Sequence, residues 1–103
     1  MMMSVTTRIR RSSSNVFRDL GFPAEEAENL RLRADLMIQL TKLIQKRGLT
    51  QSKAARLMGV TQPRISDLTR GKIYRFSIDT LVEMLGHAGV RVSLLLKTRK
   101  RVA

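Results

Sequence analysis

Three polar residues that can pair with DNA bases lie close together in the stretch QPRISDLT. A glutamine amide such as that of Gln62 can pair bidentately with adenine, and the guanidinium of Arg64 can pair bidentately with guanine. The carboxylate of Asp67 can accept from cytosine N4, or it can instead orient Arg64, which lies three residues earlier on the same helical face. Pro63 has no N–H to donate, so it offers only an apolar contact, for example to a thymine methyl. This set is typical of a helix that reads base edges in a major groove.

Polar and basic residues that suit phosphate contacts lie on both sides of this stretch. They are Gln51, Lys53, Thr61, Arg70, Lys72 and Arg75. Phosphate contacts supply affinity and register, whereas base-edge contacts supply sequence preference. Gln51 begins a predicted helix, whose free backbone N–H groups also favour an anion. The alternative for any single cation in this set is a solvated surface position.

Two short helices joined by a tight turn are predicted to position these side chains. The first covers residues 51–58 and the second residues 62–69, and Gly59 between them suits the left-handed conformation that ends a helix. Thr50 and Thr61 each stand where an N-cap hydroxyl is needed. The apolar residues expected to face the core are Ala54, Ala55, Met58, Val60, Ile65 and Leu68.

Longer elements are predicted on both sides of this pair. Apolar residues recur every three or four positions in residues 24–47, which predicts one long amphipathic helix ending at Gly48. Its predicted buried face consists of Leu32, Leu36, Leu40, Leu43 and Ile44, and Leu30 and Met37 extend this apolar stripe to a second side of the helix. A further helix is predicted over residues 78–88, with Ser77 as its cap. Its predicted inward face is Leu81, Val82 and Leu85, and Phe76 is expected to anchor the preceding loop to the core.

From Asn15 to Lys97 the chain resembles the lambda-repressor-like, or XRE, family, and within it the HigA-like antitoxins. The resemblance is carried by TQSKAARLMGVTQPRISDLTRG with the flanks NVFRDLGFPAEEAENLRLRADLM and RGKIYRFSIDTLVEMLGHAGVRVSLLLK. It implies a mainly α fold, a helix-turn-helix bundle of about five helices. It also implies an antitoxin that represses its own operon from an inverted-repeat operator and neutralises an RNA-cleaving toxin.

One β-strand is predicted near the C-terminus, in VRVSLLLK. Val90, Val92, Leu94 and Leu96 alternate and would form one face of it. A single strand cannot satisfy its own backbone groups. The sequence therefore predicts antiparallel pairing with the same strand of a second copy, and hence a homodimer. The competing partners are the tail containing Val5 and Ile9, or a strand of a toxin.

Outside the helical body the chain is polar and basic. The predicted organisation is a flexible N-terminal segment (1–22), a helix-turn-helix and dimerisation domain (23–97) and a basic tail (98–103). The candidates for toxin binding are Val5, Ile9, Val16, Phe17 and Leu20. Residues 15–22 can form a helical turn that docks on the body, or a segment reserved for a partner.

Composition limits the function classes. The 103 residues carry a net charge of +12 with a pI near 11.6, which favours nucleic acid as a partner. No cysteine and one histidine argue against an enzyme, and we expect no metal, no cofactor and no membrane span. The expected location is the bacterial cytoplasm, at the nucleoid. The alternatives are a stand-alone XRE-type regulator of phage or plasmid origin, and a protein that packages nucleic acid without sequence preference.

Overall fold

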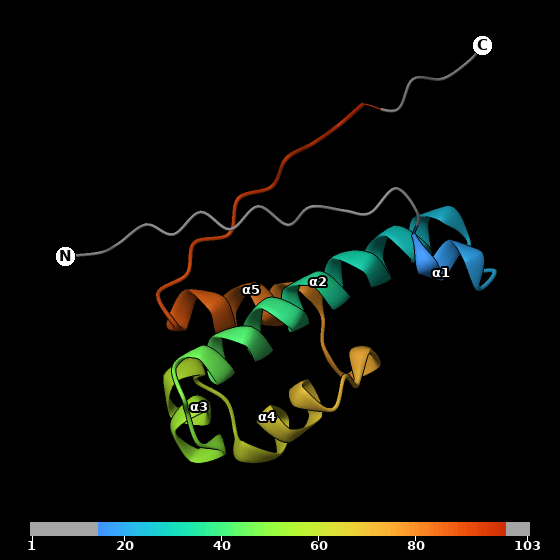
Figure 1. Ribbon diagram of the computed structural model, residues 1–103. Coiled ribbons are helices and arrows are strands. Elements are labelled where there is room, and N and C mark those ends of the chain that lie inside the picture. The colour runs from blue at the N-terminus through green and yellow to red at the C-terminus, as the bar shows by residue number, and fades with distance from the viewer. Residues whose placement is uncertain (1–14, 99–103) are drawn as a thin grey trace, which may run out of the picture.

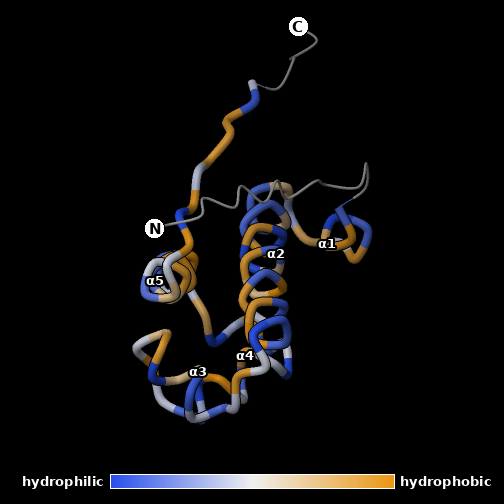
Figure 2. Tube along the Cα trace, turned by 60° about the vertical axis from the view of Figure 1, so that its left-hand side comes forward, coloured by the Kyte–Doolittle hydropathy of each residue, from blue (hydrophilic) through white to orange (hydrophobic). Residues whose placement is uncertain are grey.

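The computed structural model describes residues 15–98, which form a bundle of α-helices with one short 3-10 helix. The elements are α1 (Val16–Asp19), α2 (Ala24–Lys46), α3 (Gln51–Met58), α4 (Gln62–Thr69), η1 (Ile73–Arg75) and α5 (Ile78–His87). α2 runs the length of the body, with α1 packed near its start and α5 beside it (Figure 1). α3 and α4 lie together below α2 and α5 (Figure 2). The predicted mainly helical bundle is confirmed.

Side-chain hydrogen bonds cap the starts of α1, α3 and α5. The Thr50 hydroxyl accepts a hydrogen bond from the Lys53 N–H at 3.1 Å, and Ser77 Oγ accepts one from the Thr80 N–H at 3.1 Å. Thr61 occupies the N-cap position of α4 but its side chain accepts no cap hydrogen bond, so the hydroxyl cap predicted there is wrong. The bounds of α3 and α4 are those predicted from the sequence.

The hydrophobic core lies where α2, α3, α4 and α5 meet. Its largest fully buried side chains are Phe76, Leu40, Met58, Ile65, Leu68, Leu81 and Met84. Leu30 of α2 is also fully buried, outside this cluster. Of the apolar stripe predicted on α2, Leu36, Leu40 and Ile44 are buried, as are Leu30 and Met37 on its second side. Leu32 and Leu43 are only half-buried, so the prediction is wrong for these two residues. α2 contacts α1, α4, η1 and α5, so several neighbours decide which of its side chains are covered. Val82 was expected to face inward and is 36% exposed.

Residues 90–98 follow α5 without forming a strand in this single chain. Val90 and Val92 pack against the core, whereas Leu94, Leu95 and Leu96 are 73%, 83% and 89% exposed. The predicted strand is thus absent from one copy, which offers no backbone partner for it. Val5 and Ile9 lie outside the described residues. Across residues 15–98, none of the helices is long and apolar enough to cross a membrane.

The turn between α3 and α4 depends on Gly59. Its φ is +69°, in the left-handed region that a side chain disfavours. The N–H of Val60 then donates to the Ala55 carbonyl at 3.0 Å, which closes the end of α3. A Cβ on Gly59 would lie 3.3 Å from both Cδ2 and Nε2 of His87. Conformation and close packing therefore both favour glycine here.

Gly59→Ala is expected to lower the free energy of unfolding by about 1–2 kcal/mol through left-handed strain alone. The contact with His87 adds a further cost, which His87→Ala should relieve. Gly71→Ala is the matched control, because Gly71 has a φ of +72° and open space around its missing Cβ. Urea unfolding followed by circular dichroism would measure these differences. A Gly59→Ala variant as stable as the unmodified chain would contradict the expectation.

Candidate nucleic-acid interface

α4 packs one face on the core and turns its first residues outward. Ile65 is 0% exposed and Leu68 is 1% exposed, which fixes the rotation of the helix about its axis. On the other side, Gln62 and Pro63 are exposed. α3 packs against α4 and holds it in place. A short helix held rigidly, with a polar first turn presented to solvent, has the geometry needed to enter a major groove.

Arg64 is held against the loop that follows α4. Its guanidinium carbon lies 4.4 Å from the ring centroid of Phe76, in cation–π geometry. Its Nη1 donates a hydrogen bond to the Arg75 carbonyl at 2.7 Å. Nε and Nη2 have no partner within residues 15–98. The side chain is therefore ordered before any ligand binds, with donors available for a guanine edge.

Asp67 has other partners than the sequence suggested. Its side chain is only 14% exposed, and it lies 3.5 Å from the Lys72 Nζ and 3.3 Å from the Arg75 Nη1. No hydrogen bond or ion pair joins Asp67 to Arg64 within residues 15–98, so this structure does not support the alternative in which Asp67 orients Arg64. Asp67 instead ties the end of α4 to the following loop.

The backbone after α4 reinforces this tie. Gly71 has a φ of +72°, and its N–H donates to the Leu68 carbonyl at 3.1 Å. The Lys72 N–H donates to the Asp67 carbonyl at 3.0 Å. These two bonds form a Schellman motif, which ends the helix and reverses the chain. The backbone hydrogen bond therefore places Lys72 next to Asp67, and the ion pair between their side chains stabilises the same arrangement.

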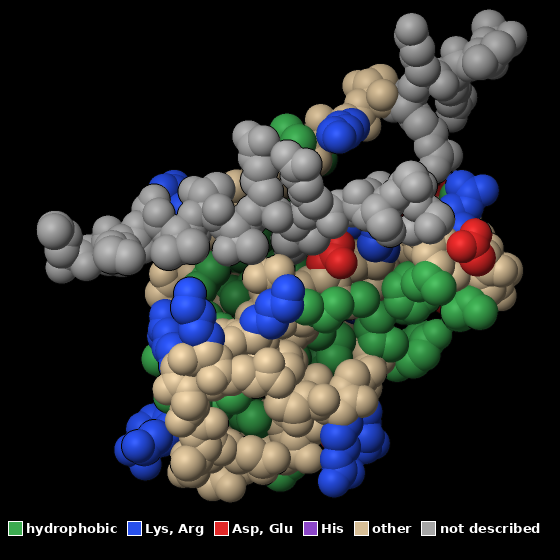
Figure 3. Space-filling model, viewed as in Figure 1, with side chains coloured by type: hydrophobic (Ala, Val, Ile, Leu, Met, Phe, Trp, Pro, Cys, Tyr) green, Lys and Arg blue, Asp and Glu red, His purple; other side chains and the backbone are tan. Residues whose placement is uncertain are grey.

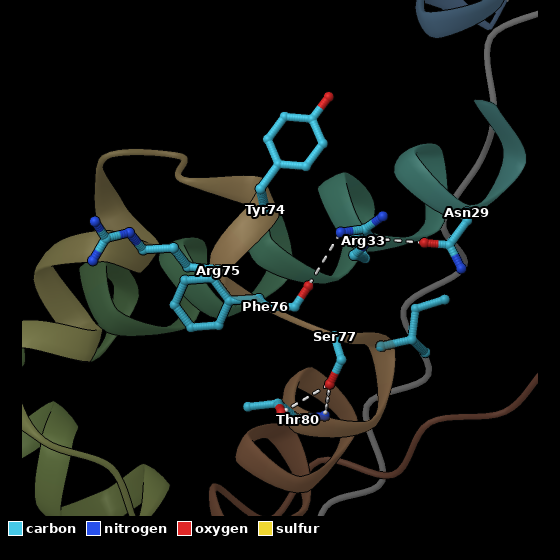
Figure 4. Close-up of a pocket in the computed structure, with 8 residues that line it drawn as sticks. Asn29, Arg33, Tyr74, Arg75, Phe76, Ser77 and Thr80 are labelled. Atoms are coloured by element: carbon cyan, nitrogen blue, oxygen red, sulfur yellow. Dashed lines mark hydrogen bonds between the residues drawn. The ribbon is translucent and has the colours of Figure 1, made fainter. Parts of the chain in front are cut away.

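Arg33 of α2 holds the same loop from the other side. Its Nη1 donates to the Ile73 carbonyl at 3.3 Å and to the Phe76 carbonyl at 3.5 Å, and its Nε donates to the Asn29 side chain at 2.7 Å. Figure 4 shows the side chains of Arg75 and Tyr74 extending away from Arg33 and Asn29. Tyr74 is 70% exposed. The loop thus has one side fixed on α2 and another free to meet a ligand.

The predicted phosphate contacts are all accessible. Gln51, Lys53, Thr61, Arg70, Lys72 and Arg75 are exposed. Between residues 50 and 76 the chain has six cations and one acid, Asp67. A strongly basic surface around an outward polar helix favours a polyanion with base edges to read.

Comparison with known proteins agrees with this geometry. A family model described as a helix-turn-helix domain matches residues 16–97. The chain belongs to this family. Its structure is also similar to that of a protein assigned to the XRE family of transcriptional regulators, with a TM-score of 0.68 and 27% identity over 76% of this chain and 88% of that one. The chain matches no curated protein. The first match shows that the chain is a helix-turn-helix protein, and the second shows that its fold resembles that of a regulator assigned to the XRE type.

Two features of the helix-turn-helix site are invisible to sequence reasoning. Phe76 was expected to be a core anchor, which its 1% exposure confirms, but its ring also supports Arg64. The sequence also gives no indication that Arg33 holds the loop after α4. Its partners are backbone carbonyls 40 and 43 residues away, and no residue type or spacing marks such a contact. The assignment of individual side chains to bases or phosphates stays a prediction.

Proposed function

We propose that this XRE-type regulator reads an inverted-repeat operator through α4. Gln62, Pro63 and Arg64 would contact base edges, and the exposed polar and basic residues around them would contact phosphates. The observation that carries this proposal is the outward first turn of α4, fixed by two buried residues and bordered by cations. A dimer would place two copies of α4 in successive major grooves, about 34 Å apart on one face of the duplex.

A homodimer is part of the proposal. Leu94, Leu95 and Leu96 are highly exposed. Exposing the apolar surface of three consecutive leucines to water is energetically unfavourable, so a partner is expected to cover part of it. Val90 and Val92 hold the start of this segment on the core. Antiparallel pairing of residues 90–97 from two copies would provide backbone partners for both strands, and it would bring Leu94 and Leu96 of each copy together on the face that carries Val90 and Val92. Two-fold symmetry of the dimer would match the symmetry of the operator.

We further propose that the chain is the antitoxin of a toxin–antitoxin pair and represses its own operon. The antitoxin proposal is supported by an apolar surface near α1 and along α2. Figure 3 shows hydrophobic side chains gathered there. Val16 is 59% exposed, Leu20 69% and Ile38 49%. Phe17 and Ile38 line an apolar groove together with Met37 of α2. A bound protein partner would cover such a surface, and this supports the antitoxin over a stand-alone regulator.

Deleting residues 1–20 is expected to abolish neutralisation of the toxin while sequence-specific operator binding is kept, since α4 is untouched. The arginines lost with this segment should lower the affinity for operator and scrambled DNA alike. Co-expression with the neighbouring reading frames would show whether a small toxic protein is encoded there and copurifies. Growth would then report neutralisation, and a gel shift would report operator binding.

Two smaller changes locate the contact within that segment. The double variant Val16→Ser and Leu20→Ser removes the exposed side chains of α1, and deletion of residues 1–14 removes Val5 and Ile9. Val82→Ser on α5 is the control for losing a partly exposed apolar side chain. Neutralisation that survives deletion of residues 1–20 would contradict this assignment of the toxin-binding segment. Absence of any toxic neighbour would leave the stand-alone regulator as the better description.

A further inference from the structure

We propose that Asp67 is a positioning residue that holds Lys72 and Arg75 in place for phosphate contacts, and that it does not read a base. The inference rests on the proposed placement of α4 in the major groove. It changes the role of the one acidic residue in the interface. The sequence alone suggested a partner for cytosine, whereas the contacts of the carboxylate point to the loop.

Both oxygens of the Asp67 carboxylate are engaged. Oδ1 faces the Lys72 Nζ at 3.5 Å, and Oδ2 accepts from the Arg75 Nη1 at 3.3 Å. The Asp67 side chain is 14% exposed, while those of Lys72 and Arg75 are 42% and 61% exposed. The acid is therefore the covered member of the cluster and the cations are the accessible ones. A base reader needs the reverse arrangement, because its acceptor must reach the base edge.

The charge pattern agrees with a positioning role. Asp67 is the only acid between residues 50 and 76, on a surface that otherwise carries cations. An unpaired carboxylate there would repel the phosphates of an approaching duplex. Paired with two cations, it forms a cluster of net charge +1 whose positive ends point outward. Two long side chains that are ordered in advance lose less conformational entropy when they bind phosphates.

The reader Arg64 does not depend on Asp67 for its placement. Its guanidinium lies over the buried ring of Phe76, whose carbonyl is held by Arg33. Loss of Asp67 should therefore disturb Lys72 and Arg75 more than Arg64. This separation makes the inference testable, because phosphate contacts and base contacts leave different signatures in binding data.

The test measures the binding of the full chain to operator and scrambled duplexes across a range of salt concentrations. Asp67→Asn is expected to weaken binding to both duplexes by a similar factor, about three- to tenfold, because Lys72 and Arg75 are no longer held where they contact phosphates and some of these contacts are lost. The slope of log affinity against log salt should become shallower by about one to two units. The base preference at each operator position should stay unchanged.

The sign of the effect separates the explanations. Simple electrostatics predicts that removing a negative charge beside the phosphates strengthens binding. Glu83→Gln on α5 is the matched control, because it removes the same charge from an exposed side chain. Unchanged or stronger binding of Asp67→Asn to scrambled DNA would overturn the proposal. So would a changed preference confined to one base pair, which is the signature of a base reader.

A double-mutant cycle supplies a second, independent criterion. In a chain that already carries Lys72→Gln and Arg75→Gln, Asp67→Asn should cause no further loss of affinity. A further loss there would show that Asp67 acts through another route and would overturn the proposal. Gln62→Ala tests the proposed placement of α4 separately. If Gln62→Ala leaves base preference unchanged, the reading by α4 fails, whereas the Asp67 results judge only the positioning role.

Discussion

Arg64→Ala is expected to weaken operator binding by about 1–3 kcal/mol, or about 5- to 150-fold, and to relax the preference at one base pair per half-site. The side chain is already extended over Phe76, with its guanidinium carbon 4.4 Å from the ring centroid. Its bond to the Arg75 carbonyl holds one end of the guanidinium. A prearranged arginine loses little rotamer freedom on binding, so most of a bidentate contact to guanine appears as affinity.

Arg64→Lys is the matched control, because it keeps the charge but cannot form the planar bidentate contact. It should bind scrambled DNA nearly as well as the unmodified chain and still lose operator affinity. Fluorescence anisotropy with the operator and with single-base-pair variants of it would measure both quantities. Equal losses of Arg64→Ala on operator and scrambled duplexes would show that Arg64 contacts phosphate and does not read a base.

Phe76→Ala is expected to lower the free energy of unfolding by about 3–5 kcal/mol. The Phe76 ring is 1% exposed and is one of the largest fully buried side chains of the core. It joins the loop after α4 to that core, so its removal leaves a cavity beside the reading helix. Small domains are stable by only about 5–15 kcal/mol, so this one change removes a large part of the total.

Phe76→Leu separates the two tasks of this residue. Leucine keeps much of the buried apolar volume and should cost less than Phe76→Ala, but it removes the aromatic face on which Arg64 lies. Urea unfolding would measure stability, and operator binding would measure the effect on Arg64. A Phe76→Ala variant that unfolds like the unmodified chain would contradict the core assignment. Unchanged operator preference in Phe76→Leu would show that the cation–π contact is not needed for reading.

Local signals were sufficient to define the central helices. Thr50 at the start of α3, Gly59 in the turn and the apolar spacing of Ile65 and Leu68 act through contacts within a few residues, and the observed bounds agree. The burial of α2 was predicted less well, because Leu32 was placed on the main buried face and is only half-buried, whereas Leu30 on the second side is fully buried. A helix covered on several sides by other elements has no single apolar stripe, so periodicity alone does not identify its buried residues.

The sequence by itself determined the helix-turn-helix, its outward polar turn and the basic character of its surroundings, because these depend on local backbone preferences and on composition. Only the tertiary structure decided the roles available to Arg64 and Asp67. Arg64 lies on Phe76, and Asp67 pairs with Lys72 and Arg75. These contacts depend on the path of the loop after α4. Arg33 holds that path from α2, 40 residues before its partner Ile73, and a bond between a side chain and a distant carbonyl leaves no pattern in the sequence.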